Sequence, residues 1–129
     1  MMKIFQGIDI VMISHMKRII LKNSNFIYDI FTEGERTYCQ SMRNPFIHYA
    51  GRFAAKESFM KAIGTGFSGT GIDSLFQEIE IVAAPSGKPE LQISGWAEKL
   101  SKKRKIRQCS VSISHSPDYA IASVILVGN

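Results

Sequence analysis

Cysteine, proline and tryptophan are scarce in this chain of 129 residues, which has two, four and one of them respectively. Cys39 and Cys109 form neither a Cys-x-x-Cys pair nor a zinc-ligand spacing, so we expect two reduced core thiols and no disulfide. The apolar start, residues 4–13, is interrupted by Gln6 and Asp9, is too short to span a membrane and lacks a signal-peptide cleavage pattern. There is no internal repeat and no low-complexity tract. We therefore expect one domain, 1–129, in the cytoplasm and without a membrane partner.

The composition is that of a folded protein with a moderate excess of positive charge. Hydrophobic residues make up 45% of the chain and charged residues 21%, which is close to the globular average and argues against disorder. The formal net charge is +5 and the pI is about 9.4. This excess favours an acidic partner or a phosphate-rich ligand without choosing between them.

The order of the expected elements indicates an α+β fold, with an N-terminal strand, a helical middle and antiparallel C-terminal hairpins. Ser14 is expected to cap the first helix, and Thr32 and Glu35 match a capping box before a later one. We expect strands at 3–13, 78–83, 89–94, 109–114 and 119–127, and helices at 15–22, 26–31, 33–42, 49–63 and 96–103. Residues 67–74 are expected to form a loop.

The helix at 49–63 is the most informative element. Helical spacing places Ala50, Ala54, Glu57 and Lys61 on one face, so that a carboxylate and an ammonium lie beside two small residues that would let a bulky ligand approach. The same pair can instead be an ordinary surface ion pair worth a few tenths of a kcal/mol. Gly64 is placed to end the helix as a C-cap.

Two further features are open to more than one interpretation. Asp9 lies among isoleucines in an expected strand, where a carboxylate is costly to bury unless it is paired or binds metal, although it can also face solvent. Gly66 belongs, with Gly64, Gly69 and Gly71, to a glycine-rich stretch whose backbone N–H groups can bind phosphate. This stretch matches no P-loop pattern.

Three pieces of the sequence together resemble one family. They are Gly-Ile-Asp-Ile-Val at 7–11, the helix and glycine stretch at 52–66, and Ile-Ser-His-Ser at 113–116 followed by Tyr119 and Ala120. In this order and spacing they resemble the holo-[acyl-carrier-protein] synthases, the short, trimeric form of the 4′-phosphopantetheinyl transferase superfamily. The resemblance covers essentially the whole chain, and Gly-Arg-Phe-Ala-Ala-Lys-Glu at 51–57 is its most specific phrase.

The resemblance implies a phosphopantetheinyl transferase. Such an enzyme transfers 4′-phosphopantetheine from coenzyme A to a serine of apo acyl carrier protein in fatty acid biosynthesis, and releases adenosine 3′,5′-bisphosphate. It implies Mg²⁺ on Asp9 and Glu57, with Lys61 beside the phosphates. Magnesium suits this chemistry because it takes one or two carboxylates together with substrate phosphates. A water or hydroxide on the metal, or one of the carboxylates, would accept the serine proton.

The resemblance also implies the binding surfaces for both substrates. Contacts to coenzyme A are expected from Arg52, Lys61, Gly64, Gly66, Lys88, Pro89 and His115. Lone histidines are often structural, and His115 is open to that interpretation too. The acidic carrier protein is expected on the basic helix that carries Lys17, Arg18 and Lys22. His15 stands where the family commonly has an arginine, which leaves the docking residues open and makes docking sensitive to pH.

Parts of the sequence are also compatible with two other functions. A small basic nucleic-acid-binding module would use the positive charge and the run at 102–105, but the chain lacks interleaved aromatic and basic residues and has no helix-turn-helix or zinc motif. We therefore expect no nucleic-acid partner, and that run to be a solvated helix end. A trimeric structural protein without catalysis is disfavoured because Asp9, Glu57 and Lys61 are all present.

Overall fold

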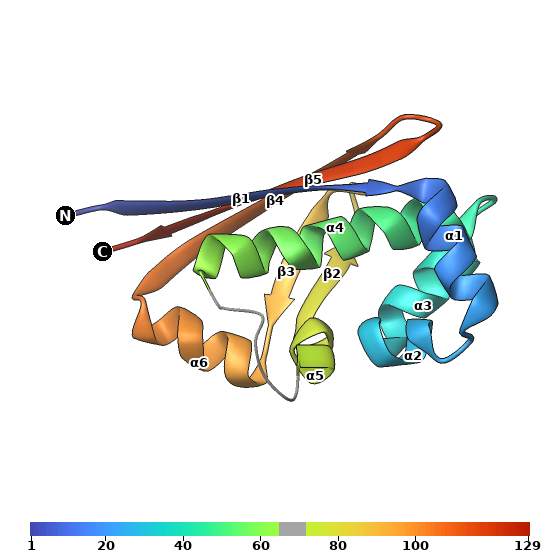
Figure 1. The fold of residues 1–129 in the computed structure, drawn as a ribbon. Coiled ribbons are helices and arrows are strands. Elements are labelled where there is room, and N and C mark those ends of the chain that lie inside the picture. The colour runs from blue at the N-terminus through green and yellow to red at the C-terminus, as the bar shows by residue number, and fades with distance from the viewer. Residues whose placement is uncertain (65–71) are drawn as a thin grey trace.

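A three-stranded antiparallel sheet packs against one long helix, α4 (Figure 1). The computed structural model describes the backbone of residues 1–64 and 72–129 and the side chains of 1–64 and 75–129. The strands stand in the order β1 (Lys3–Met12), β5 (Tyr119–Gly128) and β4 (Ile106–His115). Because β5 lies in the middle, the N-terminal strand joins the C-terminal hairpin, and the two chain ends lie side by side.

Helix α4 spans Pro45–Ile63 and begins one turn earlier than the sequence predicted. Asn44 is its N-cap, and its side chain accepts a hydrogen bond from the Phe46 N–H at 3.2 Å. Proline suits the first helical position because it has no N–H to satisfy there. The predicted C-cap is confirmed: Gly64 has φ +75°, and its N–H donates to the Met60 carbonyl.

The other elements cover the far side and one end of α4 (Figure 1). They are α1 (Ile13–Lys22), α2 (Phe26–Ile30), α3 (Glu33–Gln40), α5 (Ile72–Gln77), the antiparallel pair β2 (Ile79–Ala83) and β3 (Pro89–Ile93), and α6 (Gly95–Lys103). The α+β arrangement is therefore confirmed. The loop expected at 67–74 is wrong from residue 72, where α5 begins, and its earlier part lies outside the described residues.

Two predictions about helix ends had different outcomes. The capping box is confirmed, since the Thr32 hydroxyl accepts from the Glu35 N–H while the Glu35 carboxylate accepts from the Thr32 N–H. Ser14 is not a cap. Helix α1 begins at Ile13, whose N–H donates to the Asp118 carbonyl at 2.9 Å, so the turn after β4 takes the place of a side-chain cap.

Small and branched side chains fill the inner face of the sheet and pack against α4. On β5 the inward residues Ala120, Ala122, Val124 and Leu126 are at most 1% exposed. Ala50 and Ala54 on α4 are fully buried against this sheet. The expectation that these two alanines leave room for a ligand is therefore wrong, because their small size serves the close approach of helix and sheet.

The outer face of the same sheet is apolar and open in the single chain. Ile8 and Ile10 on β1 are 56% and 60% exposed, and Tyr119, Ile121 and Ile125 on β5 are 43%, 37% and 40% exposed. Strand β5 is thus buried on one face and apolar on both.

The two cysteines differ in their exposure to solvent. Cys39 is a buried free thiol, as expected, and burial raises its pKa to about 12. Cys109 is exposed, so its assignment to the core is wrong.

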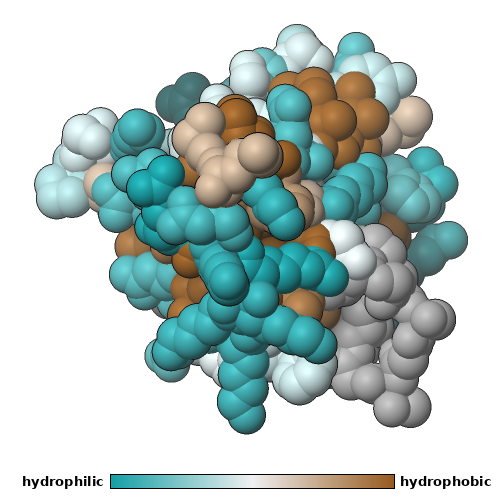
Figure 2. Space-filling view, turned by 90° about the vertical axis from the view of Figure 1, so that its left-hand side faces the viewer, coloured by the Kyte–Doolittle hydropathy of each residue, from teal (hydrophilic) through white to brown (hydrophobic). Residues whose placement is uncertain are grey.

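Lys102, Lys103 and Lys105 are exposed around the end of α6, and Figure 2 shows hydrophilic side chains gathered on that side of the molecule. None of the described helices is long and apolar enough to cross a membrane.

Candidate active site

Asp9 reaches the candidate site from the inner face of β1. It stands opposite Ala122 in the ladder between β1 and β5, on the side of the sheet that faces α4. Its side chain is only 12% exposed. Asp9 is therefore not a solvent-facing residue of the strand. It is a nearly buried carboxylate, which requires a positive partner.

Lys61, in the last turn of α4, supplies that partner. Its Nζ lies 2.9 Å from Asp9 Oδ1 and also donates to the Ile8 carbonyl at 3.1 Å. The sequence suggested that Lys61 would pair with Glu57 one turn earlier on the same helix. The ion pair is formed across the helix–sheet interface instead, and it joins residues far apart in the sequence.

Glu57 is the second carboxylate of the site. It is half-buried, and its pKa is raised above its ordinary value, first by burial and then by the negative charge of Asp9, while Lys61 opposes the shift. The raised pKa reports that the two carboxylates lie within electrostatic reach of each other. The structure thus brings together Asp9, Glu57 and Lys61, as predicted.

The donor set fits a magnesium ion. The described residues hold no group of three or more metal-ligating side chains of the His, Cys, Asp or Glu type. Two carboxylates are nevertheless enough for Mg²⁺ when substrate phosphates complete its coordination. The like-charge repulsion that raises the pKa of Glu57 is what a bound cation would relieve, and Lys61 already shows that a positive group is stable beside Asp9.

A second group of residues surrounds the buried positive charge of Arg52 on α4. We call Arg52, His48 and His115 the Arg52 group. Arg52 is 6% exposed, and its guanidinium lies 3.9 Å from the centre of the Tyr38 ring. Within the described part of the chain, Arg52 Nε is buried and has no hydrogen-bond partner. Buried donors of this kind are uncommon, and one at a predicted ligand contact is suited to an incoming acceptor oxygen.

His48, one turn before Arg52, belongs to the same group. Its ring packs edge-on against Tyr38, with 5.7 Å between the centroids. Its pKa is lowered by burial and by the nearby charges of Arg52 and His115. His115, at the end of β4, is therefore close to His48. The sequence predicted Arg52 and His115 but missed His48, whose spacing of four residues from Arg52 was the available signal.

The remaining predicted contacts are spread over other parts of the surface. Gly64 is exposed at the end of α4, and Gly66 lies outside the described residues. Lys88 and Pro89 line a cavity of about 290 Å³ between β3 and β4, with Ser110 and Val111 on its other side. The structure gives Lys88 and Pro89 a concave setting, without bringing them into contact with the carboxylates.

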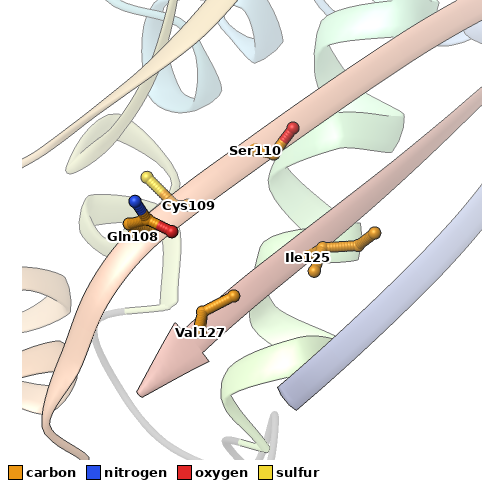
Figure 3. A pocket seen from close by; sticks show the side chains of 5 residues that line it. All are labelled: Gln108, Cys109, Ser110, Ile125 and Val127. Atoms are coloured by element: carbon orange, nitrogen blue, oxygen red, sulfur yellow. The ribbon is translucent and has the colours of Figure 1, made fainter. Parts of the chain in front are cut away.

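A hollow of about 260 Å³ lies over the C-terminal hairpin (Figure 3). It is lined by Gln108, Cys109, Ser110, Ile125 and Val127. Its lining comes from β4 and β5 alone and includes no predicted site residue. We therefore place the candidate active site at Asp9, Glu57 and Lys61; Arg52 and His48 lie earlier on the same helix as Glu57.

Comparison with known proteins finds relatives that match almost the whole chain. The family model described as the 4′-phosphopantetheinyl transferase superfamily matches residues 6–124. The holo-[acyl-carrier-protein] synthase of Caldanaerobacter subterraneus is 41% identical, and the match covers 98% of this chain and 97% of that protein. That of Syntrophus aciditrophicus is 43% identical, with 95% and 94% covered.

Solved structures show the same fold. The holo-[acyl-carrier-protein] synthase of Neisseria meningitidis aligns with a TM-score of 0.83 and 33% identity, covering 95% of this chain and 96% of that one. The Bacillus anthracis synthase in complex with coenzyme A (3′,5′-ADP) aligns with a TM-score of 0.79 and 32% identity, covering both chains fully.

Proposed function

Because the chain belongs to the 4′-phosphopantetheinyl transferase superfamily, we propose that it transfers the 4′-phosphopantetheine group of coenzyme A to a serine of apo acyl carrier protein. The observation that carries this proposal is the meeting of Asp9, Glu57 and Lys61 from a strand and a helix that are distant in sequence. The acceptor would be the carrier protein of fatty acid biosynthesis.

The reaction breaks the phosphoanhydride bond of coenzyme A and forms a phosphodiester bond to the serine. The serine oxygen forms a bond to the phosphorus that carries pantetheine, the bond from that phosphorus to the bridging oxygen breaks, and adenosine 3′,5′-bisphosphate leaves. The serine gives up one proton. Asp9 or Glu57 would accept that proton.

Asp9 and Glu57 would together hold Mg²⁺. When bound, the ion would offset the negative charge that builds on the phosphate oxygens. Lys61 is 45% exposed beside Asp9, so its ammonium can also face those oxygens as a point charge. The role of the protein residues is to hold these charges in place before the substrate arrives.

The Arg52 group would bind another phosphate of coenzyme A. Arg52 Nε is a buried donor without a partner in the described structure, and Arg52 and His115 both lie near enough to His48 to lower its pKa. A phosphate would satisfy that donor and offset the charge of the guanidinium. The edge near Lys88 and Pro89 would border the nucleotide more loosely.

Helix α1 would receive the acidic carrier protein. Lys17, Arg18 and Lys22 are exposed on it, and Lys17 Nζ lies 5.4 Å from the centre of the Phe46 ring on α4. Helix α1 follows β1 directly, so a carrier protein bound there would stand near Asp9. The exposed apolar face of β1 and β5 would be covered by other copies of the chain in a homotrimer.

Mass spectrometry of apo acyl carrier protein incubated with the protein, coenzyme A and Mg²⁺ tests the proposal directly. We expect the carrier protein to gain one phosphopantetheine and expect no gain when a chelator is present. A carrier protein that remains unmodified under these conditions, while coenzyme A and Mg²⁺ are in excess, would refute the proposed function.

A further inference from the structure

A buried ion pair joins α3 to α4 at the residue directly before Glu57. Lys56 Nζ lies 2.8 Å from Glu35 Oε1, and both side chains are completely buried. Burial lowers the pKa of Lys56, and the negative charge of Glu35 opposes that shift. The sequence showed Glu35 only as a capping residue, and its pairing with Lys56 follows from the fold.

Every donor of the Lys56 ammonium has a partner. Besides Glu35, its Nζ donates to the carbonyls of Phe76 in α5, at 2.8 Å, and Ile79 in β2, at 2.7 Å. Glu35 in turn accepts from the backbone N–H of Thr32 at 2.9 Å and of Ile81 at 2.8 Å. The pair therefore joins four elements, α3, α4, α5 and β2, through contacts of fixed direction.

Stability alone does not explain such a pair. Replacing a buried ion pair by uncharged residues of similar size is often neutral or stabilising, because removing two charges from water is costly. What the ion pair adds is geometry. Residues 56 and 57 are consecutive on a helix and point about 100° apart, so an anchored side chain at 56 fixes the direction in which Glu57 points.

The opposite side of the same turn is anchored to the sheet. The Ser58 hydroxyl lies within hydrogen-bond distance of two carbonyls, that of Ala54 in its own helix at 2.7 Å and that of Ala122 in β5 at 3.0 Å. Ala122 is the residue that stands opposite Asp9 in the ladder. The helix turn that carries Glu57 is thus held from both sides, by Lys56 toward α3, α5 and β2, and by Ser58 toward the row of Asp9.

We propose that the Lys56–Glu35 pair positions the active site by fixing the rotation of α4 and hence the placement of Glu57 relative to Asp9. The inference rests on the proposed function, since it assigns a role within that site. Neither residue is proposed to touch substrate. A displacement of about 1 Å in a reacting group can cost about a hundredfold in rate, so this small anchor can have a large effect.

The double variant Lys56→Met/Glu35→Gln tests this role. It removes both charges, preserves the approximate volume and leaves an oxygen at position 35 to accept from the Thr32 or Ile81 N–H. We expect circular dichroism to show a folded protein, kcat for transfer to fall about 30- to 100-fold, and the KM for coenzyme A to change less than about threefold. Lys102→Met/Glu98→Gln, which removes the exposed ion pair of α6, is the matched control and should leave both constants unchanged.

A second measurement does not depend on activity. Crystal structures of the two proteins should show the Glu57 carboxylate displaced from Asp9 by about 1 Å or more in the double variant, because the ion pair no longer fixes the helix turn that carries Glu57. Failure of the wild type to modify carrier protein would refute the proposed function, and this comparison of structures would still decide the positioning role.

Two results would overturn the inference. They are a wild-type kcat in the folded double variant, or a Glu57 carboxylate that occupies the same position relative to Asp9 in the two structures. Where the double variant does not fold, Lys56→Gln/Glu35→Gln decides by the same two criteria. It also removes both charges, so that neither is left buried without its partner, and we expect about a tenfold fall in kcat.

Discussion

A methyl group on Gly7 would stand 1.9 Å from the carbonyl oxygen of Ser58. Strand β1 and helix α4 thus approach each other at backbone distance, two residues before Asp9 and one residue after Glu57. This contact sets the separation of the two elements that carry the site. It also explains why Lys61 can reach both Asp9 Oδ1 and the Ile8 carbonyl.

We predict that Gly7→Ala separates β1 from α4. Backbone atoms cannot give way as a flexible side chain can, so we expect a loss of about 3 kcal/mol in the free energy of unfolding and at least a hundredfold loss of transfer, on the order expected for a displaced reacting group. Urea unfolding and the carrier-protein assay measure the two effects. Gly34→Ala is the control, because the nearest obstacle to its methyl group is the end of the Glu80 side chain at 2.9 Å. Similar losses in both variants would contradict the prediction.

Glu57→Gln should separate activity from stability. Transfer should fall at least about a hundredfold, since one of the two proposed metal ligands is lost. The fold should become more stable at neutral pH in the absence of metal. The pKa of Glu57 is higher in the folded than in the unfolded chain, so folding favours its protonated form. Ionised Glu57 therefore costs stability, and that cost begins as the pH rises through the ordinary value of 4.5.

Thermal unfolding of wild type and Glu57→Gln from pH 3 to pH 8 measures this difference. The melting temperatures should agree below the ordinary pKa and diverge above it, with the variant higher. Glu33→Gln, an exposed carboxylate in the first turn of α3, should show no such gain at neutral pH. A less stable Glu57→Gln at pH 7 would show that the carboxylate is favourably paired, contrary to the assignment.

Asp9→Asn and Lys61→Met should move the pKa of Glu57 in opposite directions. The charge of Asp9 raises this pKa and the charge of Lys61 lowers it, so removal of Asp9 should lower it and removal of Lys61 should raise it. NMR titration of the Glu57 carboxyl gives both values. Shifts of the same sign in the two variants would mean that a change of conformation, rather than the loss of charge, dominates.

Local signals in the sequence predicted most of the helices and strands. They predicted fewer of the contacts between residues that are distant in the sequence. The capping box at Thr32 and the C-cap at Gly64 follow from residue types at fixed spacing, and both are confirmed. Helix α5 was missed because the glycines before it indicate a loop. The partner of Lys61 was missed because helical spacing shows only neighbours on the same helix, whereas Asp9 is brought to it by the sheet.

The same distinction applies to the residues of the candidate site. Asp9, Glu57 and Lys61 were predicted because the sequence resembles a known family. Such a resemblance indicates which residues meet in the folded protein, but it does not give their distances or burial. The burial of Arg52 against Tyr38 and the pairing of Lys56 with Glu35 depend on packing between α3 and α4. No periodic pattern reports such contacts, so they required the structure.

Arg52 should contribute to nucleotide binding through the direction of its donors as well as its charge. Calorimetry with adenosine 3′,5′-bisphosphate should show a loss of at least about tenfold in affinity for Arg52→Met and a smaller loss for Arg52→Lys, which keeps the charge without the planar fork. Arg107→Met, at an exposed position of β4, is the control. Unchanged affinity in Arg52→Met would assign the buried guanidinium to packing against Tyr38 alone.

The outer face of the sheet should mediate self-association. Ile8→Lys on β1 and Ile121→Lys on β5 place a charge on a surface that is exposed and apolar in the single chain, so each should shift the protein toward monomer. Sedimentation velocity measures the change. Trp96→Lys serves as the control, because Trp96 is 61% exposed on α6 and lies outside the sheet. A wild type that sediments as a monomer, or sheet variants that remain trimeric, would contradict the assignment of this face. If instead the variants are monomeric and also lose transfer while Asp9 and Glu57 are intact, neighbouring subunits are needed to complete the substrate site.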